Sequence, residues 1–286
     1  MNGDAALLLL ADSRLPAGGH AHSGGVEEAV RRGAVTGAGD LARFLRGRLA
    51  TAGLVTAALA AAACELAATD GGDREVGAIR APGAPPVDDA SGGIELWRRL
   101  DAEADARTAS PAQREAARTQ GRLLLRTARR MWPSAALDTL ARALPEGSHH
   151  PVALGAAAAS AGCTPRQAAL AAAYTSVTGP ATAAVRLLGL DPVTVHRLLA
   201  DLAPAFDGTA RAACASLGDA VPEDDEPEEC GAGHHQGQHP GQPPGRQPGR
   251  HAAWQARWRG LPGHGAPALD LLAEGHLTNP MKLFVS

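Results

Sequence analysis

The sequence contains few aromatic residues. Phenylalanine, tryptophan and tyrosine make up 3% of its 286 residues, whereas hydrophobic residues together make up 45%. Alanine, leucine and valine must therefore fill the core, and alanine has the highest intrinsic helix propensity. A chain of this length and apolar content can bury a sizeable core. The composition predicts a globular, largely helical protein.

An excess of positive charge is also absent. The 27 lysine and arginine residues are set against 30 aspartate and glutamate residues, which gives a formal net charge of -3. Such a balance supplies no overall attraction to the phosphate backbone of nucleic acid. We therefore expect no nucleic-acid partner.

Segments typical of export or membrane insertion are missing. Residues 1–4 include no basic residue, and the apolar run that follows ends at Asp12, so no secretory signal is predicted. The longest weakly apolar stretch, Thr51 to Cys64, is too short for a membrane span. The four cysteines form no CxxC pair, which argues against a zinc site or a disulfide framework. These absences favour a cytoplasmic protein with no membrane partner.

The hydrophobic pattern is helical almost throughout, and no series of alternating, β-branched-rich segments predicts a sheet. We expect an all-α fold, with a single domain of about ten helices over residues 1–218. Residues 70–93 are rich in Gly, Pro and Asp and predict a mobile insertion. Residues 219–265 contain acidic, His/Pro/Gly-rich and basic runs and predict a second disordered segment, a linker. Residues 266–286 predict a C-terminal helix followed by an apolar tail that packs against another surface.

Three dipeptides predict where helices start: Ser110-Pro111, Thr164-Pro165 and Asp191-Pro192. In each pair the first residue is suited to cap the helix and proline is suited to the first helical position. Gly179-Pro180 predicts a break or kink in the helix that follows Thr164, because proline removes a main-chain hydrogen bond.

The loop from Ser13 to Gly25 contains two Gly-Gly pairs, which permit positive φ angles or close approach of another chain. No Lys-Ser/Thr pair follows these glycines, so a phosphate-binding loop is disfavoured. The residues around Ser23 resemble a nucleophile elbow, which gives the alternative of a serine hydrolase that uses Ser23. An elbow requires a preceding strand, however. We favour a turn in which Ser23 caps a helix beginning near Val26, with Glu27 close to the capping-box position.

Eleven histidines raise the question of a metal site. They include three close groups: His20 with His22; His149 with His150; and His234, His235 and His239. A site needs several ligands in a fixed geometry, which neighbouring histidines alone do not supply. We favour a polar turn at His149 and His150 and a solvated linker at the third group, whose members remain weak metal candidates. The alternative is a linker that acts as a nickel-binding arm.

Arg186 lies in an apolar helical series, from Ala183 to Leu188. Two interpretations carry equal weight. The side chain is either a solvated point on the helix or a guanidinium that holds a carboxylate or main-chain carbonyls at an interface.

Five blocks of sequence form an ordered set. They are Leu7 to Glu27, Arg114 to Leu124, His149 to Gly155, Ala183 to Leu187, and the ending Lys282-Leu283-Phe284-Val285-Ser286. In this order they resemble the signature blocks of the UreF family of urease accessory proteins, whose terminus reads Arg-Leu-Phe-x-Ser. The set spans most of the chain, and residues 70–93 and 218–265 stand between the blocks as insertions.

The resemblance implies a non-catalytic chaperone that forms an all-helical homodimer. UreF proteins bind the accessory protein UreD, also called UreH, and then the GTPase UreG, and help to deliver nickel into apo-urease; no firmly bound cofactor is implied. In that family the N-terminal loop and the C-terminal tail become ordered on UreD and form the surface that recruits the GTPase. The implied partner-contact residues are Pro16, Gly18, Gly19, His20, His22, Ser23, Gly25, Glu27, Arg186, Lys282, Leu283 and Phe284.

Four positions depart from the family pattern. His20 stands where the family commonly has an aromatic residue, and Lys282 stands where it commonly has arginine. The glutamine expected shortly after Leu188 is missing, and His150 stands where tyrosine is frequent. Lysine cannot reproduce a bidentate guanidinium contact. We therefore expect recruitment of the GTPase to be weakened or rearranged.

Overall fold

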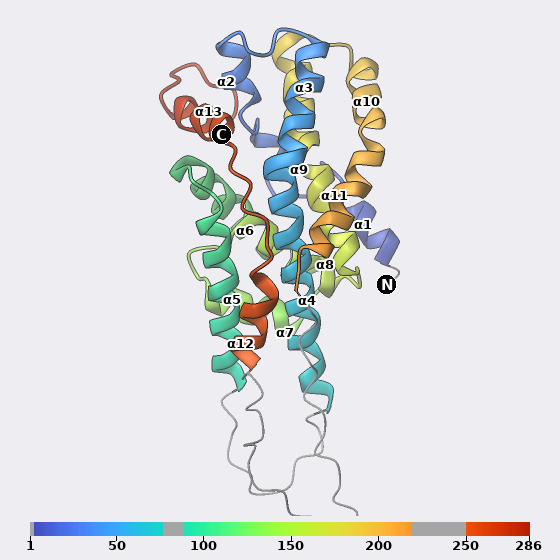
Figure 1. The fold of residues 1–286 in the computed structure, drawn as a ribbon, viewed down its shortest axis with the longest axis vertical. Coiled ribbons are helices and arrows are strands. Elements are labelled where there is room, and N and C mark those ends of the chain that lie inside the picture. Colours follow the sequence, from blue (N-terminus) through green and yellow to red (C-terminus); the bar gives the residue numbers. More distant parts are fainter. Residues whose placement is uncertain (1–2, 77–88, 219–249) are drawn as a thin grey trace, which may run out of the picture.

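The computed structural model describes residues 3–76, 89–218 and 250–286. Within these ranges the chain forms helices joined by short connections, and no strand occurs (Figure 1). The all-α fold is confirmed. The α-helices are α1 (Gly3–Ala11), α2 (Val26–Arg31), α3 (Ala38–Arg48), α4 (Leu54–Val76), α5 (Asp89–Ala106), α6 (Pro111–Met131), α7 (Ala135–Ala143), α8 (His150–Ser160), α9 (Pro165–Leu188), α10 (Pro192–Asp201), α11 (Ala203–Ala215), α12 (Arg250–Trp258) and α13 (Pro267–Leu277).

The core lies between α4, α8 and α9, whose buried faces consist largely of alanine. Small side chains allow the helices to approach closely. A Cβ atom on Gly155 of α8 would lie 2.2 Å from the carbonyl oxygen of Ala60 on α4. The contact between these two helices therefore requires glycine at position 155.

A single helical column runs through α3, a π-helical turn (Leu49–Gly53) and α4. By length and composition alone, the part from Ala38 to Thr69 could cross a membrane, but 67% of its most apolar window is buried inside the protein. Most of this window is thus already covered by the rest of the protein. The column has the features of a core helix.

The three predicted helix starts are confirmed. The side chain of Ser110 accepts a hydrogen bond from the N–H of Gln113, Thr164 forms a capping box with Gln167, and Asp191 accepts from the first turn of α10. Of the break or kink predicted at Gly179-Pro180, a break does not occur, since α9 continues through Pro180 to Leu188.

Helices extend into both segments that the sequence marks as disordered. Helix α4 continues to Val76 and α5 begins at Asp89, so only residues 77–88 of the first segment lie outside the described residues. Residues 219–249 also lie outside the described residues. The linker predicted over residues 219–265 extends too far towards the C-terminus, because α12 lies within this range. Trp254 and Trp258 lie one turn apart on α12, are both buried, and have ring centroids 5.5 Å apart.

Candidate partner-docking surface

The loop from Ser13 to Gly25 and the tail from Asn279 to Ser286 lie side by side. The N–H of Val285 donates to the carbonyl oxygen of Ala21 at 2.7 Å, and the N–H of Ser23 donates to the main-chain oxygen of Ser286 at 2.5 Å. His22 Nδ1 lies 2.5 Å from Ser286 Oγ. Figure 1 shows the C-terminus beside α13 and close to α2. The two ends of the sequence therefore form one surface.

Glu27 on α2 holds the tail by its main chain. Its carboxylate is buried and accepts the N–H of Leu283 at 2.6 Å and the N–H of Phe284 at 3.2 Å. Gly24 and Gly25, with φ angles of 59° and 89°, turn the chain into α2 just before this residue. The glycines thus place a buried acceptor opposite two main-chain donors that would otherwise lack partners.

His276, near the end of α13, contacts the same part of the tail. Its side chain is buried, its Nε2 lies 3.1 Å from the carbonyl oxygen of Phe284, and its Nδ1 lies 3.5 Å from Oε2 of Glu27. Helix α13 packs against α2 and α6. Phe284 is therefore held on both its N–H and its C=O side, by two residues from different helices.

The side chain of Phe284 is buried, and the guanidinium of Arg186 lies 5.2 Å from the centroid of its ring. This arrangement is a cation–π contact, which at exposed sites contributes on the order of 0.5–1 kcal/mol. Arg186 itself is exposed. The structure thus gives Arg186 a partner within the chain.

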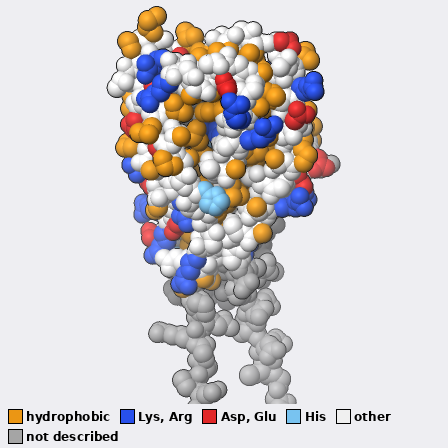
Figure 2. Space-filling view, turned by 45° about the horizontal axis from the view of Figure 1, so that its top comes forward, with side chains coloured by type: hydrophobic (Ala, Val, Ile, Leu, Met, Phe, Trp, Pro, Cys, Tyr) orange, Lys and Arg blue, Asp and Glu red, His pale blue; other side chains and the backbone are white. Residues whose placement is uncertain are grey.

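The outer face of the tail is apolar. Met281, Leu283 and Val285 are 84%, 71% and 60% exposed, and Leu271 and Leu277 of α13 are also exposed. Figure 2 shows the end of the molecule that carries α2 and α3, where hydrophobic side chains lie among lysine and arginine side chains. Single exposed apolar residues are ordinary, whereas several on one short segment are typical of an interaction surface.

A cavity of about 750 Å³ lies behind the loop and is bounded by α4, α6, α8, α9 and the tail. Arg48 reaches it from α3, is partly buried, and donates to the carbonyl oxygens of Gly24 and Ser176 at 2.8 and 2.7 Å. Burial lowers the pKa of Arg48 to about 10. The guanidinium remains charged at neutral pH and ties the loop to α9.

Two histidines in this cavity are uncharged at neutral pH. Burial lowers the pKa of His150 to about 4, and the nearby His22 adds to the effect. Burial and the charge of His20 lower the pKa of His22 as well. Neutral imidazoles are able to bind a metal. In the described part of the chain, however, neither belongs to a group of three close ligand atoms.

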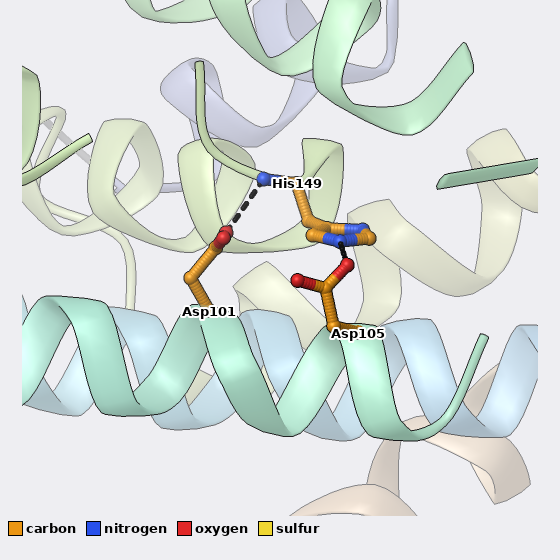
Figure 3. Close-up of side chains that lie close together, drawn as sticks. All are labelled: Asp101, Asp105 and His149. Atoms are coloured by element: carbon orange, nitrogen blue, oxygen red, sulfur yellow. Dashed lines mark hydrogen bonds and ion pairs between the residues drawn. The ribbon is translucent and has the colours of Figure 1, made fainter. Parts of the chain in front are cut away.

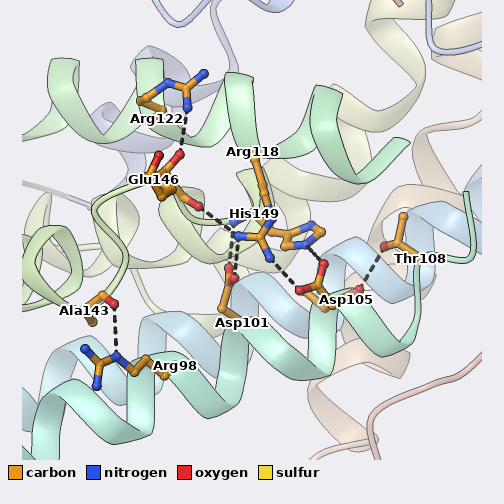
Figure 4. A network of polar contacts seen from close by, with 11 residues as sticks. Arg98, Asp101, Asp105, Thr108, Arg118, Arg122, Ala143, Glu146 and His149 are labelled. Carbon is orange, nitrogen blue, oxygen red and sulfur yellow. Dashed lines mark hydrogen bonds and ion pairs between the residues drawn. The ribbon is translucent and has the colours of Figure 1, made fainter. Parts of the chain in front are cut away.

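One such group of three does occur among the described residues, at Asp101, Asp105 and His149 (Figure 3). Asp101 accepts the main-chain N–H of His149 at 2.7 Å, and Oδ1 of Asp105 lies 2.8 Å from Nε2 of His149. Arg118 donates to the other oxygens of both carboxylates, at 2.9 and 2.6 Å (Figure 4). Both carboxylates are thus paired with Arg118, and the network is best described as a junction of α5, α6 and the start of α8.

Arg118 acts on the ionisation of Asp105. Burial favours a raised pKa for Asp105, but the hydrogen bond with His149 and the charge of Arg118 outweigh it, and the pKa is lowered. His149 is buried and stands at the start of α8. The structure thus differs from the polar turn predicted at His149 and His150, because His149 is a buried helix cap and His150 is the first residue of α8.

The residues expected to contact a partner fall into two sets. The exposed set comprises Pro16, Gly19, His20, Arg186, Lys282 and Leu283, and the buried set comprises His22, Ser23, Gly25, Glu27 and Phe284, with Gly18 partly buried. The exposed side chains are accessible to a partner. The buried ones hold the loop to the tail. Sequence reasoning missed Arg48 and His276, since neither stands in a motif. His234, His235 and His239 lie outside the described residues.

Ser23 does not cap α2. The cap position is occupied by Gly25, and only the main-chain oxygen of Ser23 accepts the N–H of Val26. Its buried Oγ has no hydrogen-bond partner among the described residues. A 3-10 turn (Gly19–Ala21) rather than a strand precedes it, and Ser23 is 0% exposed. A nucleophile elbow requires an accessible serine after a strand. Ser23 therefore has neither of these features of a nucleophile elbow.

Comparison with known proteins decides the family. A model of the UreF family matches residues 35–203. A urease accessory protein UreF from Mycobacterium sp. strain JLS is 47% identical over 207 residues, which cover 72% of this chain and 83% of the relative. The proteins of the same name from Mycolicibacterium vanbaalenii and Mycobacterium marinum are both 45% identical, over 219 and 216 residues. They cover 77% and 75% of this chain, and 89% and 87% of the relatives.

The chain belongs to the UreF family. The part matched by the family model extends from just before α3 to the end of α10 and includes Arg186. It includes neither the N-terminal loop nor the C-terminal tail. The evidence for the docking surface is therefore the set of contacts between the loop and the tail in this chain.

Proposed function

We propose that this UreF protein acts without catalysis in urease maturation, by assembling with UreD and the GTPase UreG and so helping to deliver nickel into apo-urease. The partners named here are those that the resemblance to the UreF family implies. The observation that carries it is the pairing of the N-terminal loop with the C-terminal tail, which presents an apolar, solvent-exposed face on a rigid support.

The exposed face has the composition of a protein-binding surface. Met281, Leu283 and Val285 provide apolar area, and Arg186 and Lys282 add charge beside it. Apolar centres with arginine nearby are enriched at protein interfaces. UreD is the partner proposed for this face, and UreG is proposed to join once UreD has bound.

We also propose a cytoplasmic homodimer as the working form. The three described cysteines are free and two of them are buried. Burial raises the pKa of the Cys64 thiol to about 12, so this thiol is unreactive at neutral pH. Free, unpaired thiols are typical of a reducing compartment.

Co-purification tests the proposal. Full-length chain is expected to retain its cognate UreD from a mixture of purified proteins, and the pair is expected to retain UreG. Apo-urease supplied with nickel, UreD, UreG and GTP is expected to gain activity only when the chain is added. Activation to the same level without the chain would contradict the proposal, as would failure to retain UreD.

A further inference from the structure

A row of arginines lines an open groove between α6 and α7. The groove has a volume of about 470 Å³, and its charged lining consists of one aspartate and four exposed arginines: Asp138, Arg122, Arg126, Arg129 and Arg130. The arginines stand at i, i+4, i+7 and i+8 of α6, which is the spacing of side chains on one face of a helix. They cover about 12 Å of its length. The groove thus has an excess of positive charge in a chain whose formal net charge is -3.

Two of the four guanidiniums are held in place by the chain itself. Arg122 donates to the carbonyl oxygen of Glu146 at 2.7 Å (Figure 4). Arg129 pairs with Asp138 of α7 at 2.8 Å. Asp138 is the one carboxylate in the groove lining, so the pair with Arg129 uses the only negative charge that the described lining offers.

The other two guanidiniums are free. Arg126 and Arg130 have no hydrogen bond or ion pair among the described residues. They lie four residues apart on α6, at the spacing at which like charges on a helix repel each other. An anion bound between them would relieve this repulsion and would receive charge-assisted hydrogen bonds from two planar forks.

The rest of the groove lining is largely apolar. Leu125 is buried, Ala141 and Leu144 are partly buried, and Pro145 is exposed. Contact with an aliphatic side chain would remove this surface from water. A ligand that suits the whole groove therefore combines negative charges with an apolar group.

This combination favours a protein segment over a nucleic acid. No aromatic side chain lines the groove within the described part of the chain, so bases would have no ring to stack on. The net negative charge of the chain also provides no overall attraction to a phosphate backbone. Glutamate or aspartate with a neighbouring leucine provides both of the required chemical groups.

We propose that the groove between α6 and α7 is a second docking surface, which binds a carboxylate-rich segment of a partner protein. Arg126 and Arg130 pair with carboxylates of this segment, and one of its aliphatic side chains contacts Leu125 and Leu144. Charge thus selects the segment, and the apolar contact distinguishes it from other anions.

The groove is separate from the tail surface described under the proposed function. Helix α13 meets α6 at its start, where Glu274 accepts from Ser110 and from the N–H of Ala112. The arginines of the groove lie in the second half of α6. No described residue lines both this groove and the cavity behind the N-terminal loop. The second surface therefore goes beyond the function proposed above.

Fluorescence anisotropy with an acidic peptide tests the proposal. The full-length chain is titrated into a fluorescein-labelled synthetic peptide, Ala-Glu-Glu-Leu-Glu-Glu-Leu-Glu-Glu-Ala, at low and at high salt. Binding is expected at low salt and is expected to weaken as salt screens the charges. One control peptide has glutamine in place of every glutamate, and another has serine in place of both leucines. We expect them to bind at least about tenfold and about threefold more weakly.

A pair of double variants locates the binding. Arg126→Gln with Arg130→Gln removes the two free guanidiniums and keeps the apolar lining, and glutamine suits a helix as well as arginine does. This variant is expected to bind the acidic peptide about tenfold more weakly. The control, Arg46→Gln with Arg197→Gln, removes the same charge from exposed arginines of α3 and α10. It is expected to stay within about twofold of the wild type.

Lack of binding of the acidic peptide to the wild type at about 1 mM would overturn the proposal. Equal losses in the two double variants would also overturn it, as would equal affinity for the acidic peptide and either control peptide. Single-stranded polyuridylate that bound more tightly than the peptide, and lost this binding in the α6 variant, would assign the groove to nucleic acid instead. No accessory protein takes part, so failure to retain UreD leaves these outcomes unaffected.

Discussion

The main-chain N–H of Leu283 donates a 2.6 Å hydrogen bond to Oε1 of Glu27, across 256 positions of sequence. The bond joins the tail to the first turn of α2. It also leaves the side chain of Leu283 pointing outwards, where it is 71% exposed. The residue thus combines two properties of a docking segment, a fixed main chain and a free apolar side chain, and preorganisation of this kind reduces the entropy lost on binding.

The close contact between α4 and α8 predicts a large effect of a small substitution. In Gly155→Ala the new methyl group would lie 2.2 Å from the carbonyl oxygen of Ala60, so the two helices must separate. We expect the free energy of unfolding to fall by about 3 kcal/mol. Gly208→Ala on α11, where a Cβ atom meets nothing within 4 Å, is expected to raise it by up to about 1 kcal/mol. Urea denaturation measures both, and equal effects would contradict the packing.

The pairing of Glu28 predicts sensitivity to acid. A hydrogen bond with Arg31, supported by Arg32, lowers the pKa of Glu28 to about 2 against the opposing effect of burial. A carboxyl whose pKa is lower in the folded state adds stability above its unfolded pKa, and this stability is lost as the pH falls towards the folded value. Both arginines are about half exposed, so we expect a loss of only about 1 kcal/mol between pH 4.5 and about pH 2.

Glu28→Gln removes this titrating group, so its stability is expected to change less over that pH range than that of the wild type. Thermal denaturation at several pH values measures the difference. A variant as acid-sensitive as the wild type would assign the effect to another carboxyl.

The burial of α12 predicts that part of the supposed linker contributes to stability. Trp258 is 2% exposed, so Trp258→Ala is expected to lower the free energy of unfolding by about 3 kcal/mol. Gln255→Ala, at an exposed position of the same helix, is expected to change it little. Chemical denaturation of both variants decides the matter; no loss in Trp258→Ala would mean that α12 does not pack.

Local signals made part of this structure predictable. Ser110 and Thr164 start helices because a side-chain acceptor and a following proline act within one turn, and such signals do not depend on distant residues. Helix α12 was missed because its apolar signal is limited to Trp254 and Trp258, in a segment otherwise rich in Arg, Gln, Pro and Gly. The average composition of a segment gives little weight to two large side chains, although burial of those two is enough to pack the helix against its neighbours.

The site was predictable to a lesser degree. The resemblance to UreF brought the loop and the tail forward together, but it presented Glu27 as a contact residue, whereas the structure buries its side chain against the tail. Nothing in the sequence of α13 marks His276, because its role depends on how α13 packs against α2. Ser23 was assigned to the helix cap from spacing alone, and Gly25 takes that position with a positive φ angle that favours glycine.

The central claim is that the tail forms the partner surface, and the dissociation constant for purified cognate UreD tests it most directly. Leu283→Ser removes an exposed apolar side chain from the tail, and Val193→Ser removes a comparably exposed one from α10. We predict that Leu283→Ser weakens binding at least about tenfold while Val193→Ser leaves it within about twofold of the wild type. Equal affinity of Leu283→Ser and the wild type, or a larger loss in Val193→Ser, would contradict the assignment.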